Sequence, residues 1–547
     1  MTIKSILVAT ACLSVLSFAA IPEMKITTKD NKDVLTVCSG MEMMGMCMGT
    51  TTKSYFNITN FQLTGHSTRN SKPDSIKVRG NSTANAAKKP YKIKFGEKVS
   101  LFNKEPAKSW VLLANFYDAT FALNSMAFEL GKRLGLEFTP TSQHVDLHIN
   151  NQYKGIYQLT EQIQSNKGRV DIREKHNGWL VEFDYHDPEQ DERLSYFKTS
   201  KYDLGTFIKA PELDEMENPR DSTQLRFVKT DLNNLVNKMA ENGFPNNGYR
   251  DLIDLESFAK YVLIQLVMDN SDFNSKFQDG GLPGSNYAYK IDDCEKIKAG
   301  PLWDFDLAVV TKSSHPRHDY SKDNETITPT HAFYKKLWED DVFKAKYKKA
   351  WIENKNHFQA MSNFIDSISN AVRGSVNNNT WNSGTLNTST FDSEIANLKS
   401  WWTKRLNWVG QQIGSQLNGK DGQLGIDGSK DIAQSSNACN TRSSSSNNIS
   451  SSSNKSSSSS SATTPILLSQ TTIGNIHAQA KNNAIVLENL PNNAKIEVYN
   501  LQGKHIYSTN SENSQILRIP VLTKGMYIIR VRLGNSTSTY QNRIYLY

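Results

Sequence analysis

The segment GPLWDFDLAVV, residues 300–310, carries two aspartates, Asp304 and Asp306, inside an apolar run that we expect to form a strand. A buried carboxylate is costly unless it is paired or bound to a metal ion. Mg²⁺ prefers a few carboxylates together with phosphate oxygens. The segment therefore predicts that Asp304 or Asp306 is the metal ligand of a nucleotide site, with a structural salt bridge as the alternative.

The residues before this segment add a second group of polar side chains. A strongly apolar helix is expected over 251–268, and it opens directly into the loop DNSDFN. This loop offers Asp269, Asp272 and Asn274, and Asn286 follows in SNYAYK. Phosphoryl transfer needs a carboxylate that orients the attacking hydroxyl and an amide oxygen that holds Mg²⁺. We therefore expect a catalytic aspartate here, with Asn274 and Asn286 as further metal ligands; a solvated or helix-capping loop is the alternative.

A turn rich in small residues lies further towards the N-terminus, between two strand-like runs in KVRGNSTANAAKKPYKIKF (77–95). The turn consists of Arg79, Gly80, Asn81 and Ser82. Exposed backbone N–H groups in such a turn suit phosphate oxygens, although many turns of this kind are only turns. The returning strand carries Lys88, Lys89, Lys92 and Lys94. One inward-facing lysine among them could reach the phosphates of a nucleotide.

Two segments between these motifs have clear periodicity. A helix is expected within 118–135, with Asp118 as its N-cap and Gly135 at its close, and it carries Glu129. Glu129 could pair with the strand lysine or simply be exposed. Residues 145–163 predict a hairpin with NNQYKG as its turn, and its second strand runs into Glu161. In a kinase-like fold, the adenine of the nucleotide would bind beside a strand that leads into a linker in this way.

Together, RGNST with KKPYKIKF, LLANFYDATFALNSMAFELGKRLGL, LHINNQYKGIYQLTEQI and GPLWDFDLA resemble the CotH family of spore-coat-type atypical protein kinases, over roughly residues 75–415. The resemblance implies an α+β, atypical protein-kinase-like bilobal domain. It also implies transfer of phosphate from ATP to Ser or Thr of a protein substrate, with Mg²⁺ or Mn²⁺.

The resemblance assigns roles to individual residues. The glycine-containing loop falls on the turn at 79–82, and the nucleotide lysine falls on Lys89, with Lys92 as runner-up. The catalytic aspartate falls on Asp272 of Asn270-Ser271-Asp272, and the metal aspartate on Asp304, with Asp306 sharing the ion. Asp269 is the alternative base, because Asp269 and Asn274 are spaced like the Asp and Asn of an ordinary kinase loop. Where family members often carry an Arg, this chain has Ala122-Leu123-Asn124.

The C-terminal part of the chain changes character twice. Residues 421–464 form a Ser/Asn-rich linker that cannot bury enough apolar surface to offset its ordering entropy. Residues 465–547 return to short alternating runs and predict a small all-β, immunoglobulin-like sandwich. The stretches VYNLQGKHIY and LTKGMYIIRV resemble the C-terminal sorting domains of the type IX (Por) secretion route, which implies contact with that secretion machinery. An accessory or carbohydrate-binding domain is the alternative.

The N-terminus and the composition indicate an exported protein. Residues 1–20 predict a signal peptide, 21–66 a β-rich lead-in, and 67–420 the kinase-like domain. No later segment is apolar over the length that a membrane-spanning helix needs, so none is expected in the mature chain. A disulfide between Cys38 and Cys47 is plausible in such a location. The net charge of +8 is spread among interleaved acids and bases, which argues against a nucleic-acid partner.

Two functions of different class follow. One is an active secreted or cell-surface kinase, whose protein substrate could include its own tract Ser443–Ser461, which is rich in hydroxyl groups and tethered at high effective concentration. The other is a non-catalytic surface scaffold, binding carbohydrate or protein, built on the same fold. Dependence of phosphate incorporation on ATP and metal separates the two.

Overall fold

The computed structural model describes two compact units, which divide between Asn448 and Ile449 and are treated separately. The described residues of the first unit are 21–38, 42–43, 46–47, 51–64, 72–80, 82–186, 195–212, 226–274, 284–309, 326–377 and 388–420. Those of the second are 477–481, 484–488, 490, 493–500, 505–511, 516–520, 525–533 and 539–546. The expected signal peptide 1–20 and linker 421–464 lie outside these ranges.

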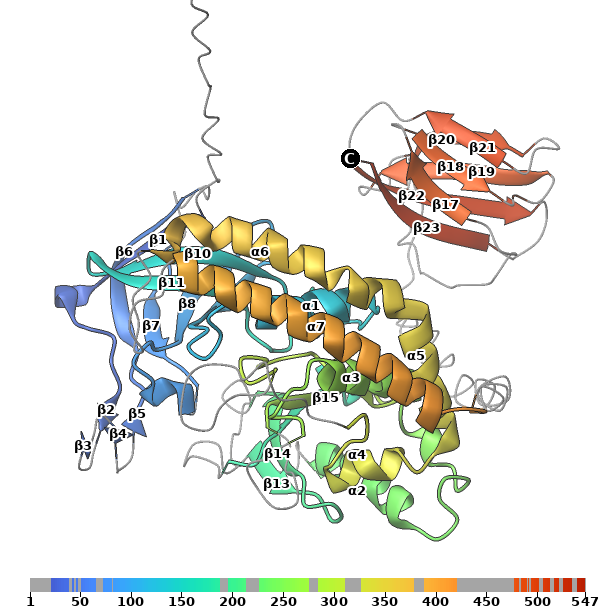
Figure 1. The fold of residues 1–547 in the computed structure, drawn as a ribbon, viewed down its shortest axis with the longest axis horizontal. Helices are drawn as coiled ribbons and strands as arrows, with labels where there is room; N and C mark the ends of the chain where they lie inside the picture. Colours follow the sequence, from blue (N-terminus) through green and yellow to red (C-terminus); the bar gives the residue numbers. More distant parts are fainter. Residues whose placement is uncertain are drawn as a thin grey trace, which may run out of the picture. The chain divides into compact units, whose positions relative to one another are not determined.

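The first unit begins with a closed β-barrel (Figure 1), in the order β1-β10-β11-β9-β8-β7-β6. Its strands are β1 (Glu23–Thr28), β6 (Phe56–Leu63), β7 (Ser75–Val78), β8 (Tyr91–Val99), β9 (Ala107–Leu113), β10 (Ser142–Ile149) and β11 (Gln152–Glu161). The segment 21–66, expected as a lead-in, supplies β1 and β6 and so closes the barrel. Two short pairs precede β6: β2 (Val37–Cys38) with β5 (Thr51–Thr52), and β3 (Glu42–Met43) with β4 (Met46–Cys47).

Local sequence explains the barrel hairpin that was expected over 145–163. β10 and β11 pair antiparallel, and their turn is only Asn150-Asn151, shorter than the NNQYKG that the sequence suggested. Both asparagines have positive φ, 52° and 62°, the left-handed conformation that a tight hairpin turn requires and that Asn tolerates well. Alternate residues of the strands, such as Ile93, Val145 and Leu147, fill the barrel interior and are fully buried.

Beyond the barrel lies a five-stranded sheet in the order β13-β14-β12-β15-β16 with helices around it. The strands are β12 (Trp179–Phe183), β13 (Tyr196–Lys198), β14 (Gly205–Ala210), β15 (Asn286–Lys290) and β16 (Lys298–Ala299). The helices are α1 (Leu123–Arg133), α2 (Arg226–Ala240), α3 (Leu255–Val267), α4 (Ala332–Leu337), α5 (Asp341–Gln359), α6 (Met361–Val376) and α7 (Thr388–Gln416). One large apolar cluster joins these helices to the sheet. The fold is therefore mixed α+β, as the sequence predicts.

Helix α3 has the apolar interior that its sequence predicts, but it begins at Leu255 rather than at residue 251. The side chain of Asp254 accepts hydrogen bonds from the N–H groups of Glu256 and Ser257, both at 3.0 Å, and so caps the first turn. Most of the helix is buried on all sides, including Phe258 and Val262. Because it is apolar all round, α3 is the central helix of this part of the unit.

The C-terminal end of α3 is held by a residue from far along the chain. Arg405 of α7 is 1% exposed, and its guanidinium donates to the carbonyl oxygens of Leu266 at 2.6 Å and Val267 at 3.4 Å. The last carbonyls of a helix have no partner within the helix, so an arginine there satisfies them and complements the helix dipole. The guanidinium also lies over the ring of Trp408 at 4.7 Å. Helix α7 thereby fixes the point at which the loop after α3 begins.

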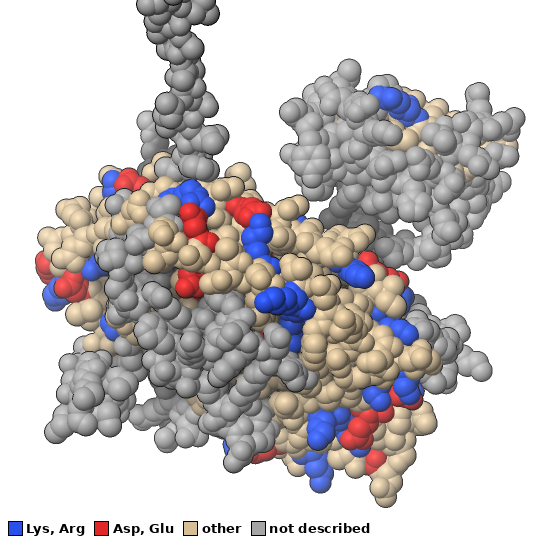
Figure 2. All heavy atoms as spheres, viewed as in Figure 1, with Lys and Arg blue, Asp and Glu red and all other residues tan. Residues whose placement is uncertain are grey.

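Helices α6 and α7 run side by side (Figure 1) and are joined by ion pairs. Lys399 lies 2.6 Å from Asp366, and Arg373 lies 2.7 Å from Asp392. Acidic and basic side chains also lie among one another on the described part of the face shown in Figure 2, as the interleaved sequence predicts. Within the described ranges, no helix combines the length and the apolar character needed to cross a membrane.

The second unit consists of two antiparallel sheets that share one apolar core. The sheets run β17-β18-β21 and β20-β19-β22-β23. Their strands are β17 (His477–Lys481), β18 (Ala484–Glu488), β19 (Ala494–Asn500), β20 (His505–Asn510), β21 (Ile516–Pro520), β22 (Gly525–Leu533) and β23 (Thr539–Leu546). The core takes Ile485 and Ile519 from the first sheet and Val498 and Val531 from the second, all fully buried. The all-β expectation for this part of the chain is confirmed.

Candidate active site

Two loops that are about thirty residues apart in the sequence lie side by side after α3. The N–H of Ser271 donates to the carbonyl of Leu307 at 3.3 Å, and the N–H of Val309 donates to that of Met268 at 3.0 Å. The side-chain amide of Asn270 donates to the carbonyl of Asp304 at 3.3 Å. These bonds tie the DNSDFN loop to the DFD segment and bring their aspartates into one site.

The DFD segment is irregular, which corrects the strand expected over 300–310. Asp304 has φ of 61° and Val309 has φ of 57°, both left-handed, and a strand cannot continue through such residues. The N–H of Phe305 is held instead by the side chain of Asn124 in α1, at 2.9 Å. Asn124 is 2% exposed, so α1 positions the acidic segment from within the protein interior. Sequence reasoning assigned Asn124 no such contact.

The aspartates of the two loops act on one another electrostatically. Burial raises the pKa of Asp272 well above its usual range, and the charges of Asp304 and Asp184 raise it further. The pKa of Asp306 is likewise raised well above its usual range, by burial and then by Asp304 and Asp272. A side-chain hydrogen bond between the two residues raises the pKa of Asp306 and lowers that of Asp304. The set is therefore poised to bind protons or a cation.

The pKa of Asp304 is raised less, because opposing causes act on it. Burial raises it, whereas the positive charge of Arg79 and the hydrogen bond from Asp306 lower it. The hydroxyl of Ser285 lies 3.4 Å from the Asp304 carboxylate. Among these aspartates, Asp304 is therefore the one whose pKa is lowered by Arg79 of the barrel.

Sequence reasoning missed Asp184, which follows strand β12. Its carboxylate accepts hydrogen bonds from His186 Nδ1 at 2.8 Å and from the N–H of Ser285 at 2.9 Å. Burial acts to raise its pKa, but the hydrogen bond and charge of His186 lower it overall, so Asp184 stays ionised beside Asp272 and Asp304. The signal was present in WLVEFDYH, where acids interrupt an apolar run as they do in WDFD.

Two tyrosines also stand beside the acids. The pKa of Tyr185 is raised to about 12 by burial and then by Asp272, Asp184 and Asp304. Burial and the same loops, through Asp306, Asp272 and Asp304, raise the pKa of Tyr117. Tyr185 is 47% exposed, so it lies at the open side of the site. Tyr117 lies in the segment LLANFYDATF that carries the family resemblance, but the sequence assigned a role to neither tyrosine.

The barrel contributes positive charge to this site. Arg79, at the end of β7, places its guanidinium over the ring of Trp303 at 5.4 Å and acts on Asp304. Gly80 has φ of 89°, and a Cβ there would meet the hydroxyl of Thr83 at 2.4 Å, so the turn needs glycine. Asn81 lies outside the described residues, as does the side chain of Ser82, whose backbone begins a short 3₁₀ turn.

Of the strand lysines, Lys92 lies on the same side of the barrel as Arg79. Lys92 is paired across strands with Lys77, and burial followed by the charges of Lys77, Lys94 and Arg79 lowers its pKa to about 8, while Glu212 opposes this. The positive charge of a half-buried lysine among other cations is only partly compensated, so an anion that binds there is stabilised. It is therefore a candidate ligand for phosphate oxygens.

Lys89, the first choice from the sequence, has a different position. Its ammonium donates to the carbonyls of Ala84 at 3.0 Å and Ala86 at 3.3 Å and so holds the turn after Gly80. Lys88 is buried, with burial lowering its pKa to about 7, and it donates to the carbonyl of Ile156 at 2.6 Å. Both lysines brace the barrel end.

The two glutamates in the expected site are also engaged elsewhere. Glu129 pairs with Arg133 one turn along α1, at 2.8 Å, and is not brought to a strand lysine. The carboxylate of Glu161 accepts from the N–H of Thr141 at 2.7 Å and from its hydroxyl at 2.9 Å, which fixes the start of β10. The sequence ELGKR, residues 129–133, already indicated the pairing of Glu129 with Arg133, because glutamate and arginine stand four residues apart on one helix face.

The remaining candidates lie around the loops with other partners. The Asn274 side-chain oxygen accepts from the N–H of Thr330 at 3.0 Å, and that of Asn286 accepts from the Tyr261 hydroxyl at 3.1 Å. Asn286 is fully buried. Asp269 is 4% exposed and has φ of 52° immediately after α3. Of the two possible bases, the structure brings Asp272 against Asp304.

The donor set fits a divalent cation that completes its shell with phosphate. Among the described residues, the only three acidic, histidine or cysteine groups with ligand atoms within 4.8 Å of one another are Asp292, Asp293 and Cys294. The site acids are therefore too spread to form a closed three-ligand cage. Asp304 and Asp306 could hold a divalent cation whose remaining ligands are phosphate and water oxygens, the coordination that Mg²⁺ favours.

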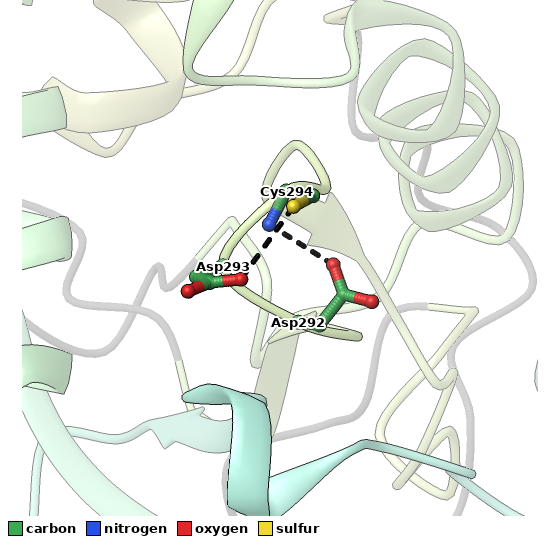
Figure 3. A group of neighbouring side chains, drawn as sticks. All are labelled: Asp292, Asp293 and Cys294. Atoms are coloured by element: carbon green, nitrogen blue, oxygen red, sulfur yellow. Dashed lines mark hydrogen bonds between the residues drawn. The ribbon is translucent and has the colours of Figure 1, made fainter. Parts of the chain in front are cut away.

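The cluster at Asp292, Asp293 and Cys294 (Figure 3) is structural. Cys294 is disulfide-bonded, so its sulfur is not a thiolate ligand, and its 3.6 Å approach to Asp293 is a contact only. Asp292 accepts from the N–H of Cys294 at 3.0 Å and pairs with Arg173 at 2.7 Å. The pairing expected between Cys38 and Cys47 falls on side chains outside the described residues.

Comparison with known families accounts for both units. Residues 76–409, more than half of the chain, match the family model described as CotH kinase protein. Residues 479–545 match the secretion system C-terminal sorting domain. No curated protein matches the chain. A kinase family implies ATP as phosphate donor, and the sorting domain indicates export to the cell surface or beyond, by way of the secretion machinery. The chain belongs to the CotH kinase protein family and carries a C-terminal secretion sorting domain.

Proposed function

We propose that this protein is an exported, metal-dependent kinase that transfers phosphate from ATP to Ser or Thr of proteins. The barrel serves as the nucleotide-binding lobe and the helical part as the catalytic lobe of a kinase-like bilobal domain over 67–420. A signal peptide at 1–20, a linker at 421–464 and an immunoglobulin-like sorting sandwich at 465–547 complete the domain organisation. One observation carries the proposal: two distant loops bring Asp272 and Asp304 into one site that faces Arg79.

Each residue has a role that its surroundings support. Asp272 orients the acceptor hydroxyl and takes its proton as the oxygen forms a bond to the γ-phosphorus and the bond to the β-phosphate oxygen breaks, releasing ADP. Arg79 and Lys92 bind the phosphates from the barrel side. Asn124 and Asn270 are positioning residues, because they hold the backbone of the DFD segment.

Asp304 and Asp306 are the side chains that would hold Mg²⁺ or Mn²⁺. Such an ion supplies positive charge that neutralises the phosphate oxygens and lowers the pKa values of the neighbouring acids. Asp272 needs this effect, since a base must be ionised and its pKa is raised by Asp304 and Asp184 after burial. Metal binding and activation of the base are therefore coupled in this site.

The function is tested by incubating the purified protein with labelled ATP and a hydroxyl-rich acceptor protein. Phosphate incorporation is expected with Mg²⁺ or Mn²⁺ and is expected to disappear with a chelator. Incorporation that persists in the chelator contradicts the metal role. Absence of labelling under every metal condition, together with binding of polysaccharide or protein, favours the scaffold function instead.

We expect the substitution Lys92→Met to lower kcat/KM for ATP by about 10- to 100-fold, because a charged hydrogen bond to phosphate contributes about 1.5–3 kcal/mol. The matched variant Lys89→Met should leave kcat/KM for ATP within about threefold, since Lys89 holds backbone carbonyls. Steady-state kinetics with varied ATP compares the two. A larger loss in Lys89→Met would return the nucleotide role to Lys89.

We expect phosphate on the tract Ser443–Ser461 of the protein itself. The tract lies in the linker that follows the kinase-like domain, which gives its hydroxyls a high effective concentration at the site. Mass spectrometry of the wild-type chain and of Asp304→Ala, produced side by side, measures the effect. A wild-type tract without phosphate, in a preparation that labels an added acceptor, would exclude the tract as a substrate but leave the activity intact.

A further inference from the structure

We propose that the outer face of the sheet β20-β19-β22-β23 is the surface by which the sorting domain docks on an acidic protein surface of the secretion machinery. This inference is independent of the kinase activity and rests on the second unit alone. We call this face the basic sheet face and define it by Lys495, Glu497, Tyr499, Arg530 and Arg532.

The alternation of the two central strands shows which side chains form this face. In β19, Ile496 and Val498 are fully buried in the core, as are Ile529 and Val531 in β22. Successive side chains of a strand point to opposite faces. The residues between them therefore lie on the outer face, where Lys495 and Arg532 are exposed and Tyr499 and Arg530 are partly buried.

The register places like charges together on this face. Lys495 pairs directly with Arg532, and Glu497 pairs with Arg530. Directly opposed cations destabilise a sheet. Glu497 offsets part of this cost: it lies 3.0 Å from Lys495, and although burial acts to raise its pKa, Lys495 and Arg532 lower it overall. With three cations and one carboxylate, these four residues carry a net charge of +2.

The side chains on this face are also held in place before any partner binds. The guanidinium of Arg530 lies over the Tyr499 ring at 5.6 Å, and His505 packs against the same ring edge-on at 5.3 Å. An arginine stacked on an aromatic ring loses little freedom when it binds a carboxylate bidentately. Tyr and Arg are also the residues that dominate binding energy at protein interfaces.

The neighbouring edge strand extends the same face with apolar surface. β20 pairs only with β19 among the described strands, and its Ile506 is 44% exposed. Cations around an aromatic and aliphatic centre match a protein partner with carboxylates around an apolar patch. Charge complementarity of this kind sets specificity and association rate.

The test compares charge reversals on the two sheets in the full chain, expressed in cells that possess this secretion route. Arg530→Glu and Arg532→Glu reverse charge on the basic sheet face, and Arg518→Glu reverses an exposed arginine of β21 on the other sheet. The double variant Arg530→Glu/Arg532→Glu is expected to reach the cell surface or medium at least about tenfold less, and to accumulate inside. Arg518→Glu should be exported like the wild type, and Arg530→Lys/Arg532→Lys, which keeps the charge but loses the bidentate and stacked contacts, should be exported at a level between the wild type and the double reversal.

Thermal unfolding of the purified variants separates docking from folding, and all are expected to unfold within a few degrees of the wild type. Export of the double reversal at the wild-type level, or equal retention of Arg518→Glu, would overturn the proposal. Suppressor mutations that restore export are expected to replace Asp or Glu by Lys or Arg in a secretion protein. Suppressors found only in glycan or lipid synthesis, or vesicle binding that the double reversal abolishes, would assign the face to an anionic glycan or lipid instead. Normal export of Asp304→Asn keeps this outcome separate from kinase activity.

Discussion

Replacement of Asp304 by Asn is expected to reduce phosphate transfer by at least about a hundredfold, the scale of losing one electrostatic contact to a developing charge. Asp304 interacts with both parts of the site, because its carboxylate is hydrogen-bonded to Asp306 and its pKa is lowered by the positive charge of Arg79 from the barrel. An amide oxygen in its place carries no charge to hold a divalent cation. Labelled phosphate incorporated per minute from ATP measures the loss.

Stability distinguishes this effect from misfolding. Because Asp304 is buried among other carboxylates, removing its charge relieves repulsion, and Asp304→Asn should unfold in chelator at the same temperature as the wild type or above it. The matched control is Asp293→Asn, an exposed aspartate outside the site, which should keep full activity. Equal labelling by Asp304→Asn and the wild type would refute the proposed metal role.

Replacement of Asp340 by Ala is expected to lower the free energy of unfolding by about 3–5 kcal/mol, the scale of removing the buried partner of a hydrogen-bonded ion pair. The Asp340 side chain is fully buried and accepts a bidentate pair of hydrogen bonds from Arg250, at 2.7 and 2.9 Å. It also accepts from the Tyr249 hydroxyl and, as the N-cap of α5, from the N–H of Val342. Denaturant unfolding of the first unit measures the change.

The adjacent aspartate provides the control for this prediction. Asp341 is 41% exposed and forms surface ion pairs with Lys344 at 3.2 Å and Lys420 at 2.7 Å. Exposed pairs of this kind contribute up to about 1 kcal/mol. Asp341→Ala should therefore cost far less than Asp340→Ala, although the two residues are neighbours in the chain. Similar losses in both variants would show that the burial and hydrogen bonds of Asp340 add nothing to its contribution to stability.

The local sequence pattern predicted those helices and turns that are determined by neighbouring residues in the chain. The Asp254 cap and continuous apolar run define α3, and the paired asparagines at 150 and 151 define the β10–β11 turn. Closure of the barrel was not predictable in this way. β1 pairs with β10, more than a hundred residues later, and nothing within 21–66 specifies that partner.

The candidate site shows the same division. Asp272 and Asp304 could be chosen from sequence because acids next to apolar runs must be compensated, and the same reasoning applied to β12 would have found Asp184. The roles of Asn124 and Lys92 depend on neighbours from other elements. The strand expected over 300–310 was wrong because composition indicates burial but not the left-handed conformation of Asp304.

The contact of Arg405 with α3 also makes the loop that carries Asp272 dependent on a late part of the chain. The loop with Asp272 starts where Leu266 and Val267 are held, and their holder is synthesised about 140 residues later. A chain truncated before residue 405 contains both loops of the candidate site but lacks the side chain that holds the last carbonyls of α3. We therefore expect such a truncation to label no acceptor protein, even though every motif residue is present.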